Sequence, residues 1–150
     1  MKLATALSQR ADLQKRTAEL NTRLRNNAKV QDGEQPAEKP AELLKELDAV
    51  LLQLEDLVAR INLTNSTAVV EGKTVTELIA HRDMLSKKLG IMRGFLDEAS
   101  SKIDRYSRAE IKIVSTVDVA KLQKQVDALS KELRETDEKL QEINWTTELK

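Results

Sequence analysis

The sequence of residues 118–143 is DVAKLQKQVDALSKELRETDEKLQEI, in which an apolar residue recurs every third or fourth position. The recurring residues are Val119, Leu122, Val126, Leu129, Leu133, Leu140 and Ile143, with Thr136 as the polar member of the series. This heptad spacing places all of them on one face of an α-helix, where a second helix can cover them. The other positions are rich in Lys and Glu, as expected of a face in contact with water. We therefore predict a long amphipathic helix over 118–143.

Three preceding segments have the same helical periodicity, and we predict helices over 2–27, 41–63 and 76–107. The chain has only four Gly and two Pro in 150 residues, too few turn residues for a sandwich or a barrel. The predicted fold class is therefore nearly all-α, with four long antiparallel helices in a bundle or coiled-coil arrangement. We expect the helices to form a single domain over residues 1–150.

The heptad positions of the two longest helices predict which side chains lie in helix–helix seams. These residues are Leu89, Met92, Leu96, Leu129 and Leu133. The helix over 41–63 has a second series, Leu44, Leu51 and Val58, beside its own heptad positions. An apolar face this wide predicts that the helix meets more than one neighbour.

Three segments interrupt the helical pattern. Residues 28–40 contain Asp32-Gly33 and two prolines in a polar context, which predicts a loop. Residues 64–75 contain β-branched runs on both sides of Gly72, which predicts a small β-hairpin. The alternation at the start of residues 110–116 allows one short strand there. After the last helix, we expect the segment 145–149 to leave the helix and dock on or near the hairpin, in the same chain or a neighbouring one, with Trp145 as its apolar anchor.

Charge and composition limit the classes of partner. Lys and Arg number 25, Asp and Glu also number 25, and no aromatic platform is present, so we expect no nucleic-acid partner. We expect no membrane partner either, because no stretch approaches the roughly 18 apolar residues that a spanning helix needs. The chain has no cysteine, which excludes disulfides and thiolate metal sites and suits a reducing cytoplasm. We expect no cofactor.

Few residues have the character of a site. His81 is the single histidine, and Leu78 stands where a Glu-x-x-His metal motif needs a glutamate, so we expect no metal and an ordinary surface or seam histidine. No set of residues resembles catalytic machinery. The densest polar cluster beside an aromatic ring is Arg105, Tyr106 and Arg108, which could bind an anion because guanidinium groups match phosphate or carboxylate. The alternative is that these residues close a helix seam or an interface between chains.

Several short runs of sequence resemble those of a known family. They are ADLQKR at 11–16, NNAKVQ at 26–31, RYS at 105–107, EIKI at 110–113, STVDV at 115–119 and NWTTEL at 144–149. Together they resemble the septicolysin-like family of small bacterial proteins, and the resemblance covers the whole chain. That family is functionally uncharacterised, so the resemblance implies a bacterial helical protein and no particular activity. The haemolysin activity suggested by the label is not expected, because the hairpin over 64–75 is too short for the strands of about 9 to 11 residues in a membrane barrel.

The sequence as a whole predicts a non-catalytic, self-associating helical protein with a structural or protein-interaction role. A homo-oligomer is expected because the heptad faces exceed what a thin four-helix unit can cover. Other protein partners are not identified by the sequence. The alternative is a small-ligand or anion-binding protein, an enzyme included, with a site between subunits near Arg105, Tyr106 and Arg108. A ligand bound between subunits would distinguish the two hypotheses.

Overall fold

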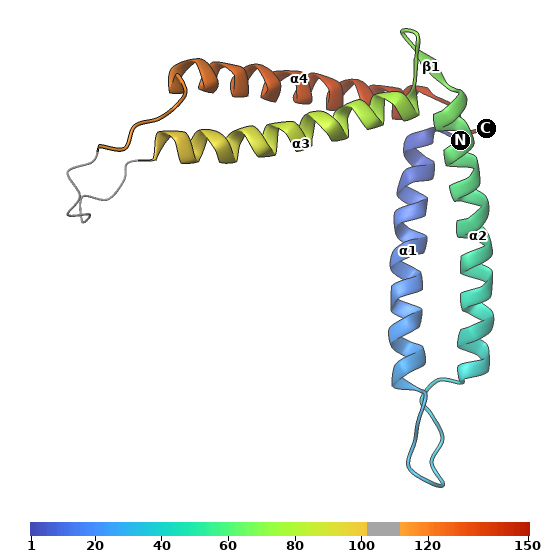
Figure 1. Ribbon diagram of the computed structural model, residues 1–150. Helices are drawn as coiled ribbons and strands as arrows, with labels where there is room; N and C mark the ends of the chain where they lie inside the picture. The colour runs from blue at the N-terminus through green and yellow to red at the C-terminus, as the bar shows by residue number, and fades with distance from the viewer. Residues whose placement is uncertain (102–111) are drawn as a thin grey trace. The chain divides into compact units, whose positions relative to one another are not determined.

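The computed structural model of the chain describes residues 1–101 and 112–150. Its helices are α1 (Leu3–Asn26), α2 (Pro40–Thr67), α3 (Val75–Ser100) and α4 (Val119–Thr146). Its strands are β1 (Val69–Val70) and β2 (Lys73–Thr74), which pair in antiparallel fashion between α2 and α3 (Figure 1). The prediction of a nearly all-α fold with four helices and a small hairpin is confirmed.

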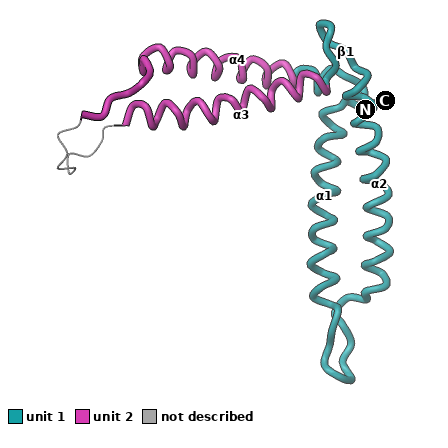
Figure 2. The backbone as a smooth tube through the Cα atoms, viewed as in Figure 1, with its two compact units in different colours: residues 1–75, 141–150 teal, residues 76–140 magenta. Residues whose placement is uncertain are grey.

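The described chain divides into two compact units, each built around two helices (Figure 2). Unit 1 comprises residues 1–75 and 141–150, and it contains α1, α2 and the hairpin. Unit 2 comprises residues 76–140, and it contains α3 and most of α4. The grouping of both units into a single domain stays a prediction.

In unit 1, α1 and α2 lie side by side (Figure 1). Apolar residues of both helices are buried between them. The buried residues form two clusters, one of Leu3, Ala6, Leu57, Ile61 and Leu149 and one of Leu20, Leu43 and Val50. Each fully buried aliphatic side chain of this size contributes about 1.5 to 3 kcal/mol relative to an exposed one. Pro40 begins α2, where its missing N–H removes a donor that would have no partner in the helix. These residues recur at helical spacing along α1 and α2, so the seam follows one apolar face of each helix.

The end of α2 differs from the prediction, because the helix continues to Thr67 rather than ending near residue 63. The side chains that suggested a break are accommodated inside the helix. Thr64 donates its hydroxyl to the carbonyl oxygen of Arg60 at 2.8 Å, and Thr67 donates to that of Leu63 at 2.7 Å. A threonine hydroxyl that bonds to the carbonyl of the preceding turn has its partner within the helix, so it does not draw the backbone into a turn. The hairpin is correspondingly shorter than the predicted range of 64–75.

The hairpin pairs Val69 with Thr74 and Val70 with Lys73 across a two-residue turn. The turn residues Glu71 and Gly72 have φ angles of 51° and 82°. Two consecutive residues with positive φ define the type I′ geometry, whose twist matches that of the paired strands. Gly72 supplies the left-handed conformation without a steric cost.

The C-terminal residues complete unit 1, but not through the predicted anchor. Trp145 lies inside α4 and is 67% exposed, so the prediction that it leaves the helix is wrong, and it does not anchor the tail within its own chain. Its docking on a neighbouring chain stays a prediction. Leu149 is the buried residue, in the cluster with Leu3 and Ile61. The backbone N–H of Leu3 donates to Thr147 and that of Leu149 donates to Met1, so the tail pairs with the start of α1. A leucine placed by backbone hydrogen bonds is buried here in preference to the larger indole.

In unit 2, α3 and α4 pack against each other along a helix–helix seam. Leu89 and Leu96 are buried with Leu122 and Val126, and Met92, Leu129 and Leu133 pack against this cluster. Asp118 caps α4, because its carboxylate accepts the N–H of Lys121 at 3.1 Å. All five residues predicted for the seam therefore lie in it.

The described part of α3 ends at Ser100, whereas the helix was predicted to reach residue 107. Residues 102–111 lie outside the described residues, so the prediction is tested only up to Ser101. The predicted strand over 110–116 is not formed by residues 112–116. In the described part of the chain no segment pairs with these residues, and a strand requires such a partner.

Candidate functional site

The sequence predicted a candidate anion-binding cluster of Arg105, Tyr106 and Arg108. These three residues lie outside the described residues. His81, on α3, is described and has its Nε2 atom 3.4 Å from Oε1 of Glu132 on α4. Both side chains are substantially exposed, so the pair contributes little to stability. Within residues 1–101 and 112–150, no group of three His, Asp or Glu side chains is arranged to hold a metal ion.

The most distinctive surface of unit 2 is a row of apolar side chains on α3. Met84, Ile91 and Phe95 are spaced seven and four residues apart, so they share one face of the helix. Their exposed fractions are 61%, 66% and 48%, although all three are large hydrophobic residues. Scattered exposed hydrophobics are ordinary on a protein surface, whereas a row at helical spacing marks a face that a partner can cover. We call these three residues the α3 row.

Packing against α4 is what turns the α3 row outward. Leu85, Leu89 and Leu96 are buried, and these residues occupy the face of α3 that meets α4. At about 100° per residue, the α3 row lies roughly a third of a turn away from that buried face. Two charged residues, Lys88 and Glu98, stand on the same side of the helix as the row, and both are exposed. Neither forms an ion pair with another described residue.

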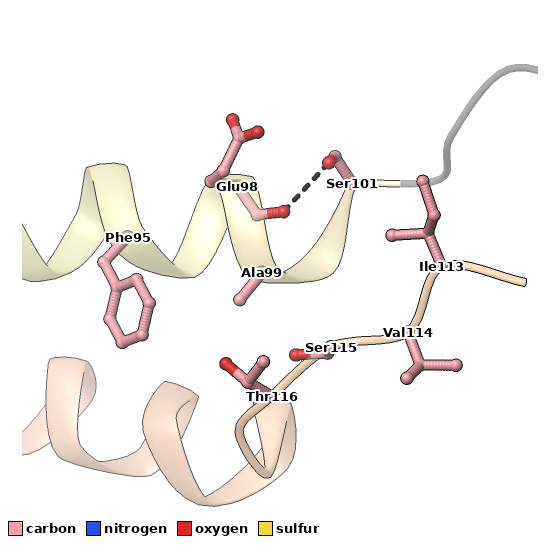
Figure 3. Close-up of a pocket in the computed structure, with 8 residues that line it drawn as sticks. All are labelled: Phe95, Glu98, Ala99, Ser101, Ile113, Val114, Ser115 and Thr116. Carbon is pink, nitrogen blue, oxygen red and sulfur yellow. Dashed lines mark hydrogen bonds between the residues drawn. The ribbon is translucent and has the colours of Figure 1, made fainter.

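A hollow of about 260 Å³ opens beside the C-terminal end of the α3 row. Figure 3 shows Phe95 and Ala99 on the side of α3 that faces Thr116 and the start of α4, with Ile113 and Val114 beyond the end of α3. Ile113 and Val114 line the hollow from that segment, and each is 66% exposed. Ser101 donates its hydroxyl to the carbonyl of Glu98 at 2.9 Å and closes the last turn of the helix. The hollow therefore extends the apolar surface of unit 2 beyond α3.

Unit 1 also carries exposed leucines. On α2, Leu44 is 50% exposed and Leu51 is 42% exposed, and the heptad spacing places them on one face. The acidic residues Asp48 and Glu55 stand near them on the same side of the helix. The neighbour beyond α1 that this face was predicted to meet is not among the described parts of unit 1.

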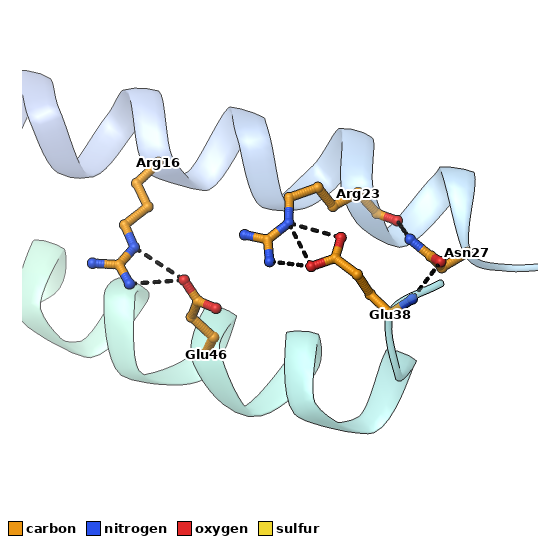
Figure 4. Close-up of polar contacts among 5 residues, drawn as sticks. All are labelled: Arg16, Arg23, Asn27, Glu38 and Glu46. Carbon is orange, nitrogen blue, oxygen red and sulfur yellow. Dashed lines mark hydrogen bonds and ion pairs between the residues drawn. The ribbon is translucent and has the colours of Figure 1, made fainter. Parts of the chain in front are cut away.

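A polar network fixes the end of unit 1 that carries the loop 27–39 (Figure 4). Arg23 of α1 forms an ion pair with Glu38, and Asn27 accepts the backbone N–H of Glu38 through Oδ1 at 2.9 Å. Further along α1, Nη2 of Arg16 lies 2.7 Å from Oε1 of Glu46 on α2. The hydrogen bond from Arg23 lowers the pKa of the Glu38 carboxyl below its ordinary value. This network orders the loop and the helix ends, which is a structural role.

At the other end of unit 1, Thr64 is fully buried and joins the tail to α2. Its Oγ1 accepts the backbone N–H of Lys150 at 3.0 Å, while Nε of Arg60 donates to the carbonyl of Lys150 at 2.9 Å. Nearby on the protein surface, Nζ of Lys2 lies 2.7 Å from Oε1 of Glu148. These contacts hold the tail against α2 and the start of α1, which is a structural role.

The described residues thus define a protein class: a helical protein of two compact units, each a packed helix pair with exposed apolar faces. None of the described helices is long and apolar enough to cross a membrane.

A family model described as a family of unknown function, DUF6847, matches residues 10–149 of the chain. The chain belongs to this family. The match agrees with the expectation of a functionally uncharacterised family and gives no support to the septicolysin-like label. A search of curated proteins found no match.

Among solved structures, the chain is similar to one described as a functionally unknown conserved protein from Corynebacterium diphtheriae. The two share 46% sequence identity, with 100% of this chain and 99% of the other covered, and a TM-score of 0.91. At this identity and coverage the likeness extends over both helix pairs, and it supports the same four-helix architecture.

The α3 row was not predicted, because only one heptad series was assigned to the helix over 76–107. The spacing of Met84, Ile91 and Phe95 was itself visible in the sequence as a second, shorter series beside the seam. The sequence could not show that this second series, rather than the first, would stay uncovered within the chain.

Proposed function

We propose that the protein is a non-catalytic, self-associating helical protein that acts as a structural or interaction element in the cytoplasm. The observation that carries this proposal is the exposure of periodic apolar rows on α2 and α3, outside the seams that each helix forms within its own unit. Burial of such a row favours an association, because it removes apolar surface from water. The absence of cysteine suits a reducing compartment.

Light scattering coupled to size exclusion, across a range from about one to several hundred micromolar, tests the association. Because standard specific interfaces reach micromolar dissociation constants or better, we expect a mass that is a multiple of 16.9 kDa within this range. A mass of one chain at every concentration would remove the proposal.

A second candidate function is the binding of a small anionic ligand, and the hollow beside Phe95 favours it. The hollow is lined by Ser101 and Ile113, which stand close in sequence to Arg105, Tyr106 and Arg108. A guanidinium group combined with an apolar hollow would suit a ligand with one charged and one apolar end.

Calorimetric titration with inorganic phosphate and with benzoate tests this candidate, using the wild type and the Arg105→Ala/Arg108→Ala variant. Saturable binding of either probe by the wild type, lost in the variant, supports the anion site. Equal heats for both proteins, or no binding of either probe, would reject it.

A further inference from the structure

Lys88 and Glu98 flank Ile91 and Phe95 of the α3 row, and the order of these four residues is self-complementary. Along one side of α3 the exposed residues are Lys88, Ile91, Phe95 and Glu98, at spacings of three, four and three. The order is therefore basic, apolar, apolar, acidic, and the spacing is the same in both directions. The midpoint of Lys88 and Glu98 and the midpoint of Ile91 and Phe95 both fall at position 93.

We propose that α3 pairs in antiparallel fashion with α3 of a second copy of this chain. The two-fold axis passes between the two helices at the level of residue 93. This inference rests on the proposed function, because it names the surface through which self-association takes place. The two-fold axis brings Lys88 opposite Glu98 of the partner subunit and Ile91 opposite Phe95 of the partner subunit. Each contact then occurs twice, as an isologous interface requires.

The charges select this arrangement over a parallel one. In a parallel pair in register, Lys88 would face Lys88 of the partner subunit and Glu98 would face Glu98 of the partner subunit. Like charges at such positions destabilise a helix pair, whereas opposite charges favour it and fix its orientation. Lys88 and Glu98 have no ion-pair partner among the described residues of their own chain, so both remain available for the interface.

Arg93, the residue at the level of the axis, does not obstruct the interface. Arg93 is directed away from the row, because its Nη2 donates to Oγ of Ser130 on α4 at 3.1 Å. The apolar pair at the centre and the charged pairs at its edges give the composition of a small interface, with an apolar core and a polar rim. A second copy fits this face without any other partner, since the face is complementary to itself.

Charge reversal tests the pairing by sedimentation equilibrium at low salt on the full chain. Lys88→Glu and Glu98→Lys should each weaken the dimer about tenfold, because each creates two like-charge contacts. The double variant Lys88→Glu/Glu98→Lys should return to within about threefold of the wild type, since it restores both opposite-charge contacts. Ile91→Asp should weaken the dimer by more than tenfold, since it buries a carboxylate without a partner. Lys124→Glu makes the same charge change on an exposed site of α4 and should have no effect.

The orientation has its own readout, because the chain has no cysteine and accepts a single spin label at a chosen site. In the antiparallel pair, two copies of position 84 are separated by about 27 Å along the helix axis and two copies of position 80 by about 39 Å, at 1.5 Å per residue. In a parallel pair both separations would be about 10 Å, the distance between packed helices. Met84→Cys and Ala80→Cys labels measured by pulsed dipolar spectroscopy should give the longer, unequal distances.

The outcomes separate this inference from the proposed function. A wild type that stays monomeric removes both. A multimer whose mass is insensitive to Ile91→Asp and to the charge reversals, or whose label distances are short and equal, removes the α3 pairing and leaves self-association through another face. Circular dichroism melts of every variant, expected to match the wild type because the changed residues are exposed, confirm that any loss of mass reflects the interface.

Discussion

Thr64 has a structural role that its local sequence did not predict. In the sequence Thr64-Asn65-Ser66-Thr67 it belongs to a polar run typical of a loop, yet its side chain is fully buried in unit 1. Its hydroxyl donates to Arg60 and accepts from the backbone of Lys150, so both of its hydrogen-bonding capacities are used. A buried hydroxyl with both bonds made links two segments that are distant in sequence.

We expect Thr64→Val to lower the free energy of unfolding by about 1 to 3 kcal/mol, because the N–H of Lys150 loses its acceptor while the volume stays nearly the same. Thr64→Ser, which keeps the hydroxyl, should retain the hydrogen bond to Lys150. Urea denaturation gives the energies, and hydrogen exchange at the amide of Lys150 reports the bond directly. Fast exchange at Lys150 in Thr64→Val but not in Thr64→Ser is the expected result, and equal exchange in the two variants would contradict this role.

Glu38 gives unit 1 a dependence on pH. The hydrogen bond from Arg23 lowers the pKa of Glu38, so the folded state binds this proton less readily than the unfolded chain does. Its contribution to stability is therefore fully present above the ordinary carboxyl pKa of about 4.3 and is lost as pH falls through the lower folded value. We expect Glu38→Gln to be less stable than the wild type near neutral pH and to show a smaller loss of stability on acidification. Denaturant midpoints measured between pH 7 and pH 3 check this, and parallel profiles for the two proteins would be evidence against the ion pair.

At the scale of the element, α2 and α3 each have one apolar face that is buried against the partner helix of their unit. Each also has apolar residues on another face, which no helix of the same unit covers. Leu96 occupies the seam between α3 and α4 and is 7% exposed, whereas Leu52 on α2 is 70% exposed. Both are leucines within long amphipathic helices, so local propensity does not distinguish them. Their different surroundings should make the same substitution differ greatly in cost.

We expect Leu96→Ala to lower the stability of unit 2 by about 2 to 5 kcal/mol, because it removes packed methyl groups and leaves a cavity. The matched variant Leu52→Ala should change stability by less than about 0.5 kcal/mol. Denaturant unfolding followed by circular dichroism compares the two. A cost below about 0.5 kcal/mol for Leu96→Ala would show that the seam is wrongly assigned.

At the scale of the whole molecule, segments from opposite ends of the sequence meet in unit 1. The backbone of residues 147–149 bonds with residues 1–3, and Leu149 enters the cluster with Leu3, Ala6 and Ile61. This closure ties the tail after α4 to the α1–α2 pair. The stability of unit 1 should therefore depend on Leu149, which is distant in sequence from α1 and α2 but packs against both.

We expect Leu149→Ala to destabilise unit 1 by about 2 kcal/mol or more, through the loss of buried methyl groups. Trp145→Ala removes a larger side chain, but that side chain is 67% exposed, so its cost should stay within about 0.5 kcal/mol. Urea melts of the two variants give the comparison. If Trp145→Ala proved the more costly change, the indole would be the anchor, as the sequence alone had suggested.

Among the features that bear on function, the sequence indicated some and left others open. The leucines of α2 that lie outside its heptads, Leu44 and Leu51, predicted a face for a further neighbour, and both residues are exposed within the chain. The cluster of Arg105, Tyr106 and Arg108 lies outside the described residues, so its role stays a prediction. The α3 row could be recognised only once the opposite face of α3 was seen to be buried against α4.

The sequence by itself determined the helices and the residues within their seams, because heptad spacing acts over a few turns and needs only one neighbouring helix. It thus predicted the burial of Leu89 and Leu96 and of their counterparts on α4. Only the tertiary structure decided that Thr64 would be buried, that Leu149 rather than Trp145 would enter the core, and that Ile91 and Phe95 would stay exposed. These outcomes depend on which segments distant in sequence come together, since burial is a property of a side chain's surroundings and not of its type.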